Sequence, residues 1–206
     1  MSERSAATFT LRLALTSDWG VATGSGVAGG VDAVVERGED GRPIIRGTVI
    51  TGIMREQALN AAHALDSGRR GGPRGRLATA LFGDATRPRL VAFSDAPVTV
   101  APATAEDGGP RPATHEAIGV SIDKETGTAK DNFLRLFERA GSGSGESTVT
   151  LLAEGLDRSP IAWTQGQRDD ARLLLALAAR LVTAVGSDRS SGDGDCEAAL
   201  HDGDTE

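Results

Sequence analysis

The apolar residues of this chain change their spacing along the sequence, from every second residue to every third or fourth and back, and they do so twice. Residues 9–15 alternate apolar and polar side chains, which is the period of a half-buried strand. From residue 48 to residue 65 the spacing is helical, and residues 89–93 are again strand-like. Residues 147–152 form another strand-like segment, and residues 167–185 another helical one. A chain that alternates in this way favours an α+β fold.

The second helical segment carries recognisable end signals. Thr164 and Gln167 have the spacing of a capping box, and Gly186 can serve as the C′ residue. Between two strand-like segments, residues 131–139 are predicted to form a short amphipathic helix, with residues 118–122 as the strand before it. Without its loops the chain reads β-α-β-β-α-β, which is the ferredoxin-like, or RRM-like, arrangement.

Loops rich in glycine and proline separate these segments. The chain has 27 glycines in 206 residues, more than the usual share of about 7%. They cluster, notably in residues 20–30, whereas residues 101–114 are a Pro/Ala/Gly-rich exposed connection. We predict one domain, residues 1–200, with an inserted hairpin at about residues 112–146 and an acidic tail at residues 201–206. The acidic composition of residues 192–206 favours a disordered end.

The charge distribution decides whether nucleic acid is a credible partner. Of the net charge of −7, seven acids and one arginine in residues 186–206 account for −6, so the other 185 residues carry about −1. Arginines 69, 70, 74 and 76 form one run, which either binds phosphates or belongs to a solvated loop. With 3% aromatic residues and no Tyr, an RNA surface would use backbone amides, glycine loops and arginines rather than stacked rings.

Several classes of protein are excluded by what the sequence lacks. Cys196 is the only cysteine, which excludes an intrachain disulfide and a cysteine-based zinc site. No apolar run approaches the roughly 18 residues that a membrane span needs. Residues 1–8 lack the basic-then-apolar order of a signal peptide. We expect a cytoplasmic protein with no membrane partner.

A series of short sequences gives a more specific indication, because they follow one another in a fixed order. They are TGSG (23–26), GGVD (29–32), GRPII (41–45), GTVITGIMR (47–55), LFG (81–83), SDA (94–96), IGVSIDKETGTA (118–129) and the glycine-rich loop 186–194. Together they resemble the RAMP superfamily, specifically the backbone subunits of type III CRISPR effector complexes.

The resemblance implies a protein that lines a guide (CRISPR) RNA in several copies. Its other partners would be the target RNA and other type III effector subunits, including the large polymerase-domain subunit. Residues 112–146 would contain the family's thumb hairpin, which wedges between bases of the guide–target duplex. The implied RNA-binding residues are Gly24, Ser25, Arg46, Gly47, Thr48, Val49, Thr51, Arg55, Ile118, Val120, Arg189 and Gly192.

The chain departs from the family pattern at positions that meet phosphates. Arg46 stands where the family usually has Pro, and Thr51 where it usually has the Lys that meets the guide backbone. Ser187 and Ser191 replace a Gly and an Arg in the last loop. Two positive charges are therefore missing, and we expect Arg46 to compensate for the first.

Two of the implied sites have simpler alternatives. The resemblance implies that Asp32 cuts the target RNA while it holds a divalent metal, Mg²⁺ or Mn²⁺, which stabilises the charge that develops as a ribose 2′-hydroxyl attacks. The alternative is a turn Asp that accepts a local N–H. Gly47 opens a helix whose N-terminus suits an RNA phosphate, and the alternative is an ordinary capped helix with Arg55 in a salt bridge.

Two rival functions remain open. One is a structural paralogue that spaces the guide RNA without cutting. The other is a stand-alone guide-processing ribonuclease, for which His63 and His115 would have to meet at one phosphate. The sequence GSGVAG at residues 24–29 also matches a dinucleotide-binding motif. The residues after that motif favour a strand and not the helix it requires, so a dinucleotide site is not expected.

Overall fold

The computed structural model describes residues 5–21, 32–69, 71–104, 108–123, 125–154, 161–186 and 192–203. It is a mixed α+β structure, as predicted. None of the helices in these ranges is long and apolar enough to cross a membrane. In chain order the elements are β1 (Ser5–Leu15), β2 (Ile44–Ile45), α1 (Gly47–Leu65), α2 (Pro73–Phe82), β3 (Val91–Phe93), β4 (Ala96–Val100), β5 (Thr114–Ile122), β6 (Ala129–Ala140), β7 (Gly143–Leu152), α3 (Gln165–Arg180) and β8 (Cys196–Asp202).

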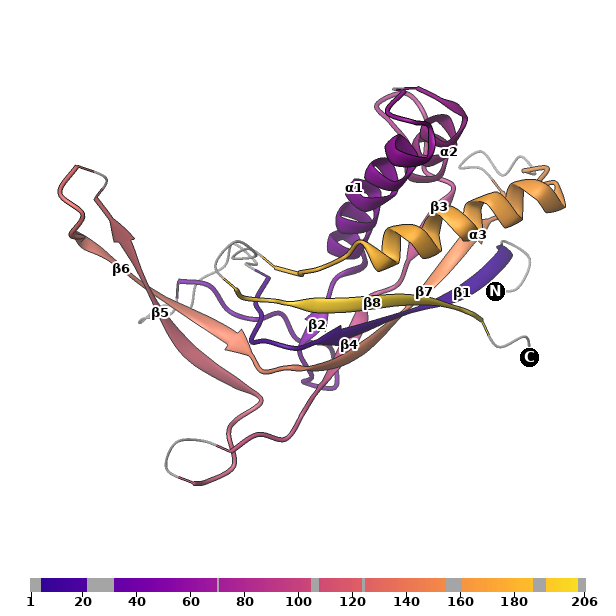
Figure 1. Ribbon diagram of the computed structural model, residues 1–206. Helices are drawn as coiled ribbons and strands as arrows, with labels where there is room; N and C mark the ends of the chain where they lie inside the picture. Colours follow the sequence, from indigo (N-terminus) through magenta and orange to yellow (C-terminus); the bar gives the residue numbers. More distant parts are fainter. Residues whose placement is uncertain are drawn as a thin grey trace.

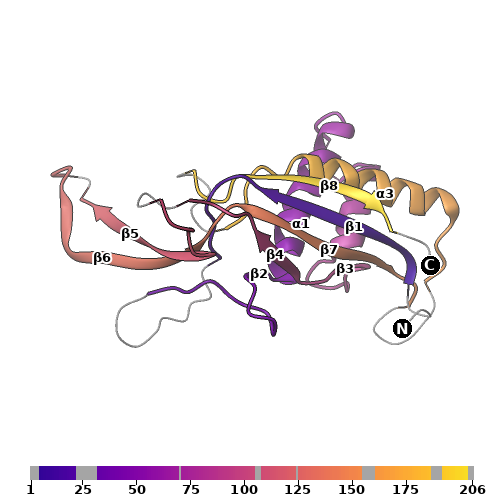
Figure 2. The same cartoon turned by 90° about the horizontal axis from the view of Figure 1, so that it is seen from below.

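The main sheet has six antiparallel strands built around β1. The order along the sheet is β2-β4-β7-β1-β8, and β3 also pairs with β7. Within β1, Leu11 lies opposite Ser147 of β7 on one side and Leu200 of β8 on the other. The helices lie on one side of this sheet and leave its other face open (Figures 1 and 2).

The core lies between the sheet and the helices. Leu11, Leu13 and Leu15 of β1 are at most 3% exposed, whereas Arg12 and Ala14 between them are exposed on the open face. This alternation is the one that the sequence pattern predicted for residues 9–15. The helix residues that complete the core are mostly alanine, which allows α1 and α3 to pack closely. They include Ala58, Ala61 and Ala62 of α1 and Ala171, Ala178 and Ala179 of α3.

A separate two-stranded hairpin, β5–β6, extends from the end of the main sheet (Figures 1 and 2). The predicted short helix at residues 131–139 is wrong, because these residues belong to β6. Ile118 lies opposite Leu136 and Glu116 opposite Glu138, so the backbone of β6 is paired across the hairpin and not within a helix. The local run Leu134-Arg135-Leu136 alternates as a strand does.

Helix α2 is an element that the sequence pattern did not predict, and it includes the end of the arginine run at residues 69–76. Pro73 occupies the first turn of the helix, where its missing N–H costs nothing. The carboxylate of Asp66 accepts the N–H groups of Arg74 at 3.3 Å and Gly75 at 2.9 Å. Asp66 therefore satisfies two N–H groups of α2 that have no partner inside the helix.

Helix α3 begins as predicted and ends early. Thr164 accepts the N–H of Gln167 at 3.2 Å, and the Gln167 side chain accepts the N–H of Thr164 at 2.9 Å, which confirms the capping box. The helix ends at Arg180, so Gly186 is not its C′ residue. The chain leaves the helix because Val185 is buried and donates its N–H to the carbonyl of Gly194, 2.8 Å away.

The acidic C-terminal segment is structured, contrary to expectation. Its composition indicated a disordered end, and the tail was placed at residues 201–206. In the structure Cys196–Asp202 forms β8 at the edge of the main sheet, paired with β1. Cys196 and Ala198 are buried, and Asp202 accepts from Arg172 at 2.6 Å. Residues 204–206 lie outside the described ranges.

We predict that Gly47→Ala destabilises the fold by about 1–3 kcal/mol. A Cβ atom at Gly47 would lie 2.2 Å from the carbonyl oxygen of Phe93, so the backbone of α1 or β3 has to shift. Gly52→Ala, five residues along the same helix, is the control, because its Cβ meets nothing within 4 Å and alanine suits a helix better than glycine. Urea denaturation midpoints should fall for the first variant and rise or hold for the second; equal midpoints would contradict the close approach.

Candidate nucleic-acid interface

Segments that are far apart in the sequence meet just beyond the end of β1. Trp19 pairs with Ala140, the last residue of β6, and the Trp19 indole N–H donates to the carbonyl of Gly141 at 3.1 Å. The N–H of Gly194, just before β8, donates to the carbonyl of Asp18 at 2.7 Å. The base of the hairpin and the turn before β8 are thus held on the same short segment after β1.

Asp32 lies against the hairpin. Its N–H donates to the carbonyl of Leu136 at 2.8 Å, and its Oδ2 accepts the N–H of Leu136 at 2.9 Å. Ala33 continues the contact as a parallel bridge to Phe137. Asp32 is exposed, and its Oδ1 accepts no hydrogen bond from the described part of the chain. The N–H that Asp32 accepts is not local, so the simple turn alternative does not describe it.

The fit of Asp32 to a divalent cation can be judged from its surroundings. Within the described ranges, no three His, Cys, Asp or Glu side chains gather into a cluster that could hold a metal ion. Mg²⁺ is commonly held by one or two carboxylates, with water and phosphate oxygens completing its shell. Asp32 therefore fits the role of a single protein ligand to a cation carried by RNA, and it does not fit a cage made by the protein alone.

The N-terminus of α1, predicted as a phosphate site, is largely filled by the protein itself. The first N–H, that of Gly47, donates to Oδ1 of Asp95 at 2.7 Å. The other oxygen of Asp95 binds Arg46 at 2.7 Å, and Arg46 also pairs with Glu36. Hydrogen bonds to Glu36 and Asp95 raise the pKa of Arg46, and the two carboxylates neutralise the positive charge of its guanidinium group. The expectation that Arg46 compensates for a missing positive charge is therefore not supported.

What remains open to a phosphate on α1 is its exposed face. Thr48, Gly52 and Arg55 are exposed and follow helical spacing along one side. Arg55 forms no ion pair with any described residue, so the predicted salt bridge is not observed. Thr51, in contrast, donates its hydroxyl to the carbonyl of Gly47 at 2.6 Å. Val49 is half-buried and its N–H bonds to Arg46, so it offers nothing to RNA.

The hairpin exposes apolar side chains to solvent. Ile118 is 69% exposed and Val120 is 54% exposed, so neither side chain belongs to a strand core. Because β5 and β6 form a sheet of their own, no helix covers either side chain. Exposed apolar side chains of this size are suited to a partner surface.

Sequence reasoning missed Glu138 and Arg37, which fix the base of the hairpin. Arg37 pairs with Glu138 and donates to Oγ1 of Thr114 at 3.0 Å, and Oε2 of Glu138 accepts the N–H of Val35 at 3.0 Å. Partial burial raises the pKa of Glu138, but the bonds from Arg37, Thr114 and Val35 outweigh it, so the pKa is lowered. The misassigned helix at residues 131–139 concealed this contact.

The loop predictions have mixed outcomes. Gly24, Ser25 and Arg189 lie outside the described residues. Gly192 is exposed in a left-handed conformation (φ +89°), with open space where a Cβ would be. Next to it, Asp193 accepts from the buried Arg139 at 3.0 Å, which ties this turn to β6.

The two histidines considered for a guide-processing site belong to different places. His115 of β5 lies 3.2 Å from the carboxylate of Asp18 and 2.8 Å from Arg111. His63 lines a hollow between α1 and α2. The structure does not bring the two rings together.

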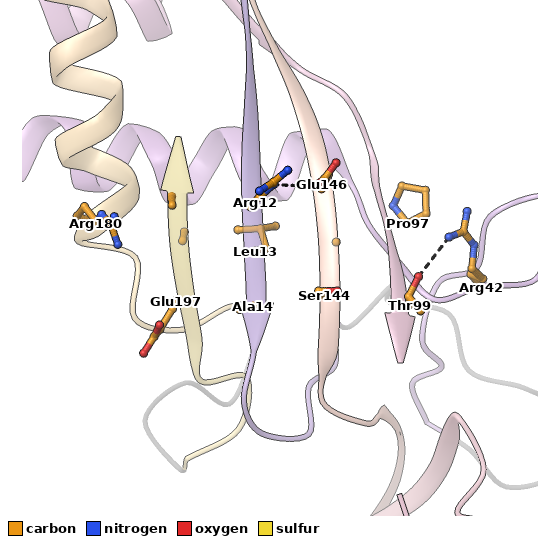
Figure 3. A pocket seen from close by; sticks show the side chains of 13 residues that line it. Arg12, Leu13, Ala14, Arg42, Pro97, Thr99, Ser144, Glu146, Arg180 and Glu197 are labelled. Carbon is orange, nitrogen blue, oxygen red and sulfur yellow. Dashed lines mark hydrogen bonds and ion pairs between the residues drawn. The ribbon is translucent and has the colours of Figure 1, made fainter. Parts of the chain in front are cut away.

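The open face of the main sheet carries a shallow hollow of about 600 Å³ (Figure 3). Arg12 bridges to Glu146 across β1 and β7 at 2.8 Å, and Arg42 reaches Thr99 at 3.4 Å. Apart from Leu13 the remaining wall consists of small or charged residues, and no aromatic side chain of the described chain lines it. This face is therefore not a platform for base stacking.

Comparison with known proteins gives a consistent result. A family model described as the RAMP superfamily matches residues 13–197. Two solved structures are similar in fold: Type III-B Cmr-beta bound to cognate target RNA, at 10% identity, and Type III-B Cmr-beta in the apo state, at 11% identity. In both cases the TM-score is 0.68, with 96% of this chain and 98% of the other covered. No curated protein matches the sequence.

We predict a pH-dependent contribution of Asp95 to stability. The Gly47 N–H, opposed by partial burial and helped by Arg46, lowers the pKa of Asp95 below its ordinary 3.8. The contribution of the Asp95 carboxylate to the stability of the fold is therefore complete above about pH 4 and is lost as the pH falls through the lowered pKa. Asp95→Asn should cost about 0.3–1 kcal/mol at pH 7. Urea unfolding at pH 7 and pH 3 should show that this difference shrinks in acid; a constant difference would contradict the assignment.

Proposed function

The chain belongs to the RAMP superfamily, and on that premise we propose that it is an RNA-binding backbone subunit of a type III CRISPR ribonucleoprotein. One observation carries the proposal: the family match and the fold likeness extend over nearly the whole chain, including both the main sheet and the hairpin. Several copies would line a guide RNA. The proposed location in the cell is the cytoplasm.

We interpret the main sheet as ferredoxin-like and the hairpin β5–β6 as the thumb. In favour of this, the strand order β8-β1-β7-β4 is the order 4-1-3-2 when the strands are numbered along the chain without the hairpin. The helices α1 and α3 follow the first and third of these strands. The hairpin is inserted between β4 and β7, close to the predicted residues 112–146.

The partners follow from the same likeness. One similar structure is of a Type III-B Cmr-beta bound to cognate target RNA. We propose that this chain also meets target RNA, together with the guide RNA, other copies of itself and the large polymerase-domain subunit. The guide would follow the exposed face of α1, where Thr48, Gly52 and Arg55 lie, toward the base of the hairpin.

The proposed chemistry is cleavage of the target RNA near Asp32. The paired hydrogen bonds to Leu136 hold the Asp32 backbone and one carboxylate oxygen against β6, and Oδ1 accepts no hydrogen bond from the described residues. Ile118 and Val120 on β5 would wedge into the duplex and splay one nucleotide. A bound divalent metal would supply stabilisation of the charge that develops at the phosphodiester. Asp32 would hold that metal ion near the base of the hairpin.

A non-catalytic subunit is the second candidate, and specific contacts favour it. Asp95 already occupies the first N–H of α1, and Arg46 is neutralised. With the Thr51 hydroxyl bonded inside the helix, this chain offers fewer phosphate contacts than the family pattern implies. Such a subunit would space the guide RNA without cutting the target.

We predict that the subunit binds single-stranded RNA with little sequence preference and more weakly as salt rises. Arg55→Ala should reduce the slope of log K against log salt by about 0.7, the value for one phosphate contact on a single strand. Arg46→Ala should lower stability and leave the slope unchanged, because Arg46 is paired with Glu36 and Asp95. Fluorescence anisotropy over a salt series measures the salt slope of each variant. Salt-independent binding by the wild type would contradict the proposed RNA surface.

We predict that Asp32→Asn abolishes target cleavage, by orders of magnitude, while RNA binding persists. Asparagine keeps an oxygen that can accept the N–H of Leu136, so the variant removes charge and little structure. Chelation of divalent cations should have the same effect. The measurement is gel-resolved cutting of a guide-complementary RNA by the assembled complex.

Asp40→Asn is the matched control for this experiment. Asp40 is an exposed carboxylate in the neighbouring turn, and its contacts are to Arg42 within that turn. The assembled complex that carries Asp40→Asn should cut the target RNA at the wild-type rate. If Asp32→Asn cuts as fast as the wild type, the catalytic role fails; if the wild type never cuts, the non-catalytic candidate takes its place.

A further inference from the structure

Eight of the 16 arginines in the described residues are paired with carboxylates. Pairs of this kind occur on the sheet, the hairpin base, the loops and α3. The pairs are Arg12–Glu146, Arg37–Glu138, Arg42–Asp40, Arg46–Glu36, Arg87–Asp84, Arg111–Asp18, Arg139–Asp193 and Arg172–Asp202.

The region between α1 and α2 contains two arginines that form no such pair. Neither Arg69 nor Arg76 forms an ion pair with a described residue, and both are exposed. Arg76 donates one guanidinium nitrogen to the carbonyl of Gly71 at 2.8 Å, which fixes its head group and leaves its other donors available. Arg69 and Arg76 line the same hollow, so an anion bound in it would meet two positive charges.

These arginines line a hollow of about 590 Å³ between the two helices. Its wall also contains Arg87, whose charge is shared with Asp84. No carboxylate lines this hollow among the described residues. The hollow on the open face of the sheet differs, because two glutamates line it.

Two glycines turn the chain between α1 and α2. Gly68 and Gly71 adopt positive φ angles of 76° and 70°, which turn the chain between the helices. Asp66 does not line the hollow, and its carboxylate accepts the N–H groups of Arg74 and Gly75. The Asp66 carboxylate is thus already used as a helix cap, and Asp84 is paired with Arg87.

The other lining groups suit a nucleoside. Asn60, His63 and Thr79 supply polar side chains, and Leu59, 41% exposed, supplies an apolar wall. Arginine forks bind phosphate oxygens in pairs. A volume of this size is in the range of small-ligand sites, which are commonly about 300–1,000 Å³.

We propose that the hollow between α1 and α2 binds a nucleoside phosphate, with Arg69 and Arg76 on the phosphate and Asn60, His63 and Leu59 around the nucleoside. The ligand is either a free nucleotide or one unit of an RNA strand. The site is separate from the hairpin base and from the start of α1, and it does not depend on the function proposed above.

The test compares two double variants of the full chain that lose the same charge. Arg69→Ala/Arg76→Ala removes the proposed phosphate ligands. Arg89→Ala/Arg180→Ala removes two exposed arginines that form no ion pair with described residues and lie outside this hollow. Calorimetry with adenosine triphosphate and anisotropy with a fluorescent decanucleotide RNA are run on both, with urea midpoints to check folding.

A loss of ATP affinity of about tenfold or more in the first variant alone assigns the site to a free nucleotide. A loss confined to the RNA assigns it to a strand. Gly75→Leu provides a second route that changes no charge: Gly75 lines the hollow, and only Asp66, at 3.7 Å, lies near an added Cβ. If neither variant weakens either ligand relative to the control, the proposal is overturned and the arginines belong to a solvated loop.

Discussion

The pairing of β1 with two strands far from it in the sequence is the constraint on which the rest of the structure depends. Residues 5–15 pair with β7 on one side and β8 on the other. Since the leucines of β1 must face the helices, this register fixes which residues of β7 and β8 are buried. Beyond Leu15 the chain meets Ala140 through Trp19 and Gly194 through Asp18. The segments of the candidate interface therefore come together because of the sheet register.

Ion pairs within the protein are a second constraint, because they limit which groups of the candidate interface remain available to RNA. Glu36, Arg46 and Asp95 form a continuous chain of ion pairs that ends on the first N–H of α1. This chain holds the segment after Asp32 onto the helix start, and in doing so it occupies the place where an anion would otherwise bind. The protein's own carboxylate stabilises α1 there, so RNA binding has to rely on the exposed side of the helix.

Sequence patterns predicted the parts whose partners are local. Thr164 and Gln167 lie three residues apart, and their capping box is present as expected. Asp32 and Leu136 lie 104 residues apart, and nothing near Asp32 indicates that its carboxylate accepts an N–H from β6. The sequence of residues 131–139 predicts a helix where the structure has β6, because the strand that pairs with these residues is β5 and their own apolar spacing does not indicate it. The pairing of Arg46 with Asp95 was not predicted either, because the two residues lie 49 positions apart in the sequence.

Strand β8 has a consequence for the behaviour of the protein at high concentration. It forms one edge of the main sheet, and an uncovered edge presents unpaired N–H and carbonyl groups to which another chain can add. Glu197, His201 and Asp202 are exposed along this strand. Asp202 is paired with Arg172, whereas Glu197 forms no ion pair with a described residue. Two such edges that approach each other therefore bring an unpaired carboxylate on each strand into the contact, which opposes their fusion into a continuous sheet. The acidity that looked in the sequence like a disordered end thus protects a folded edge against aggregation.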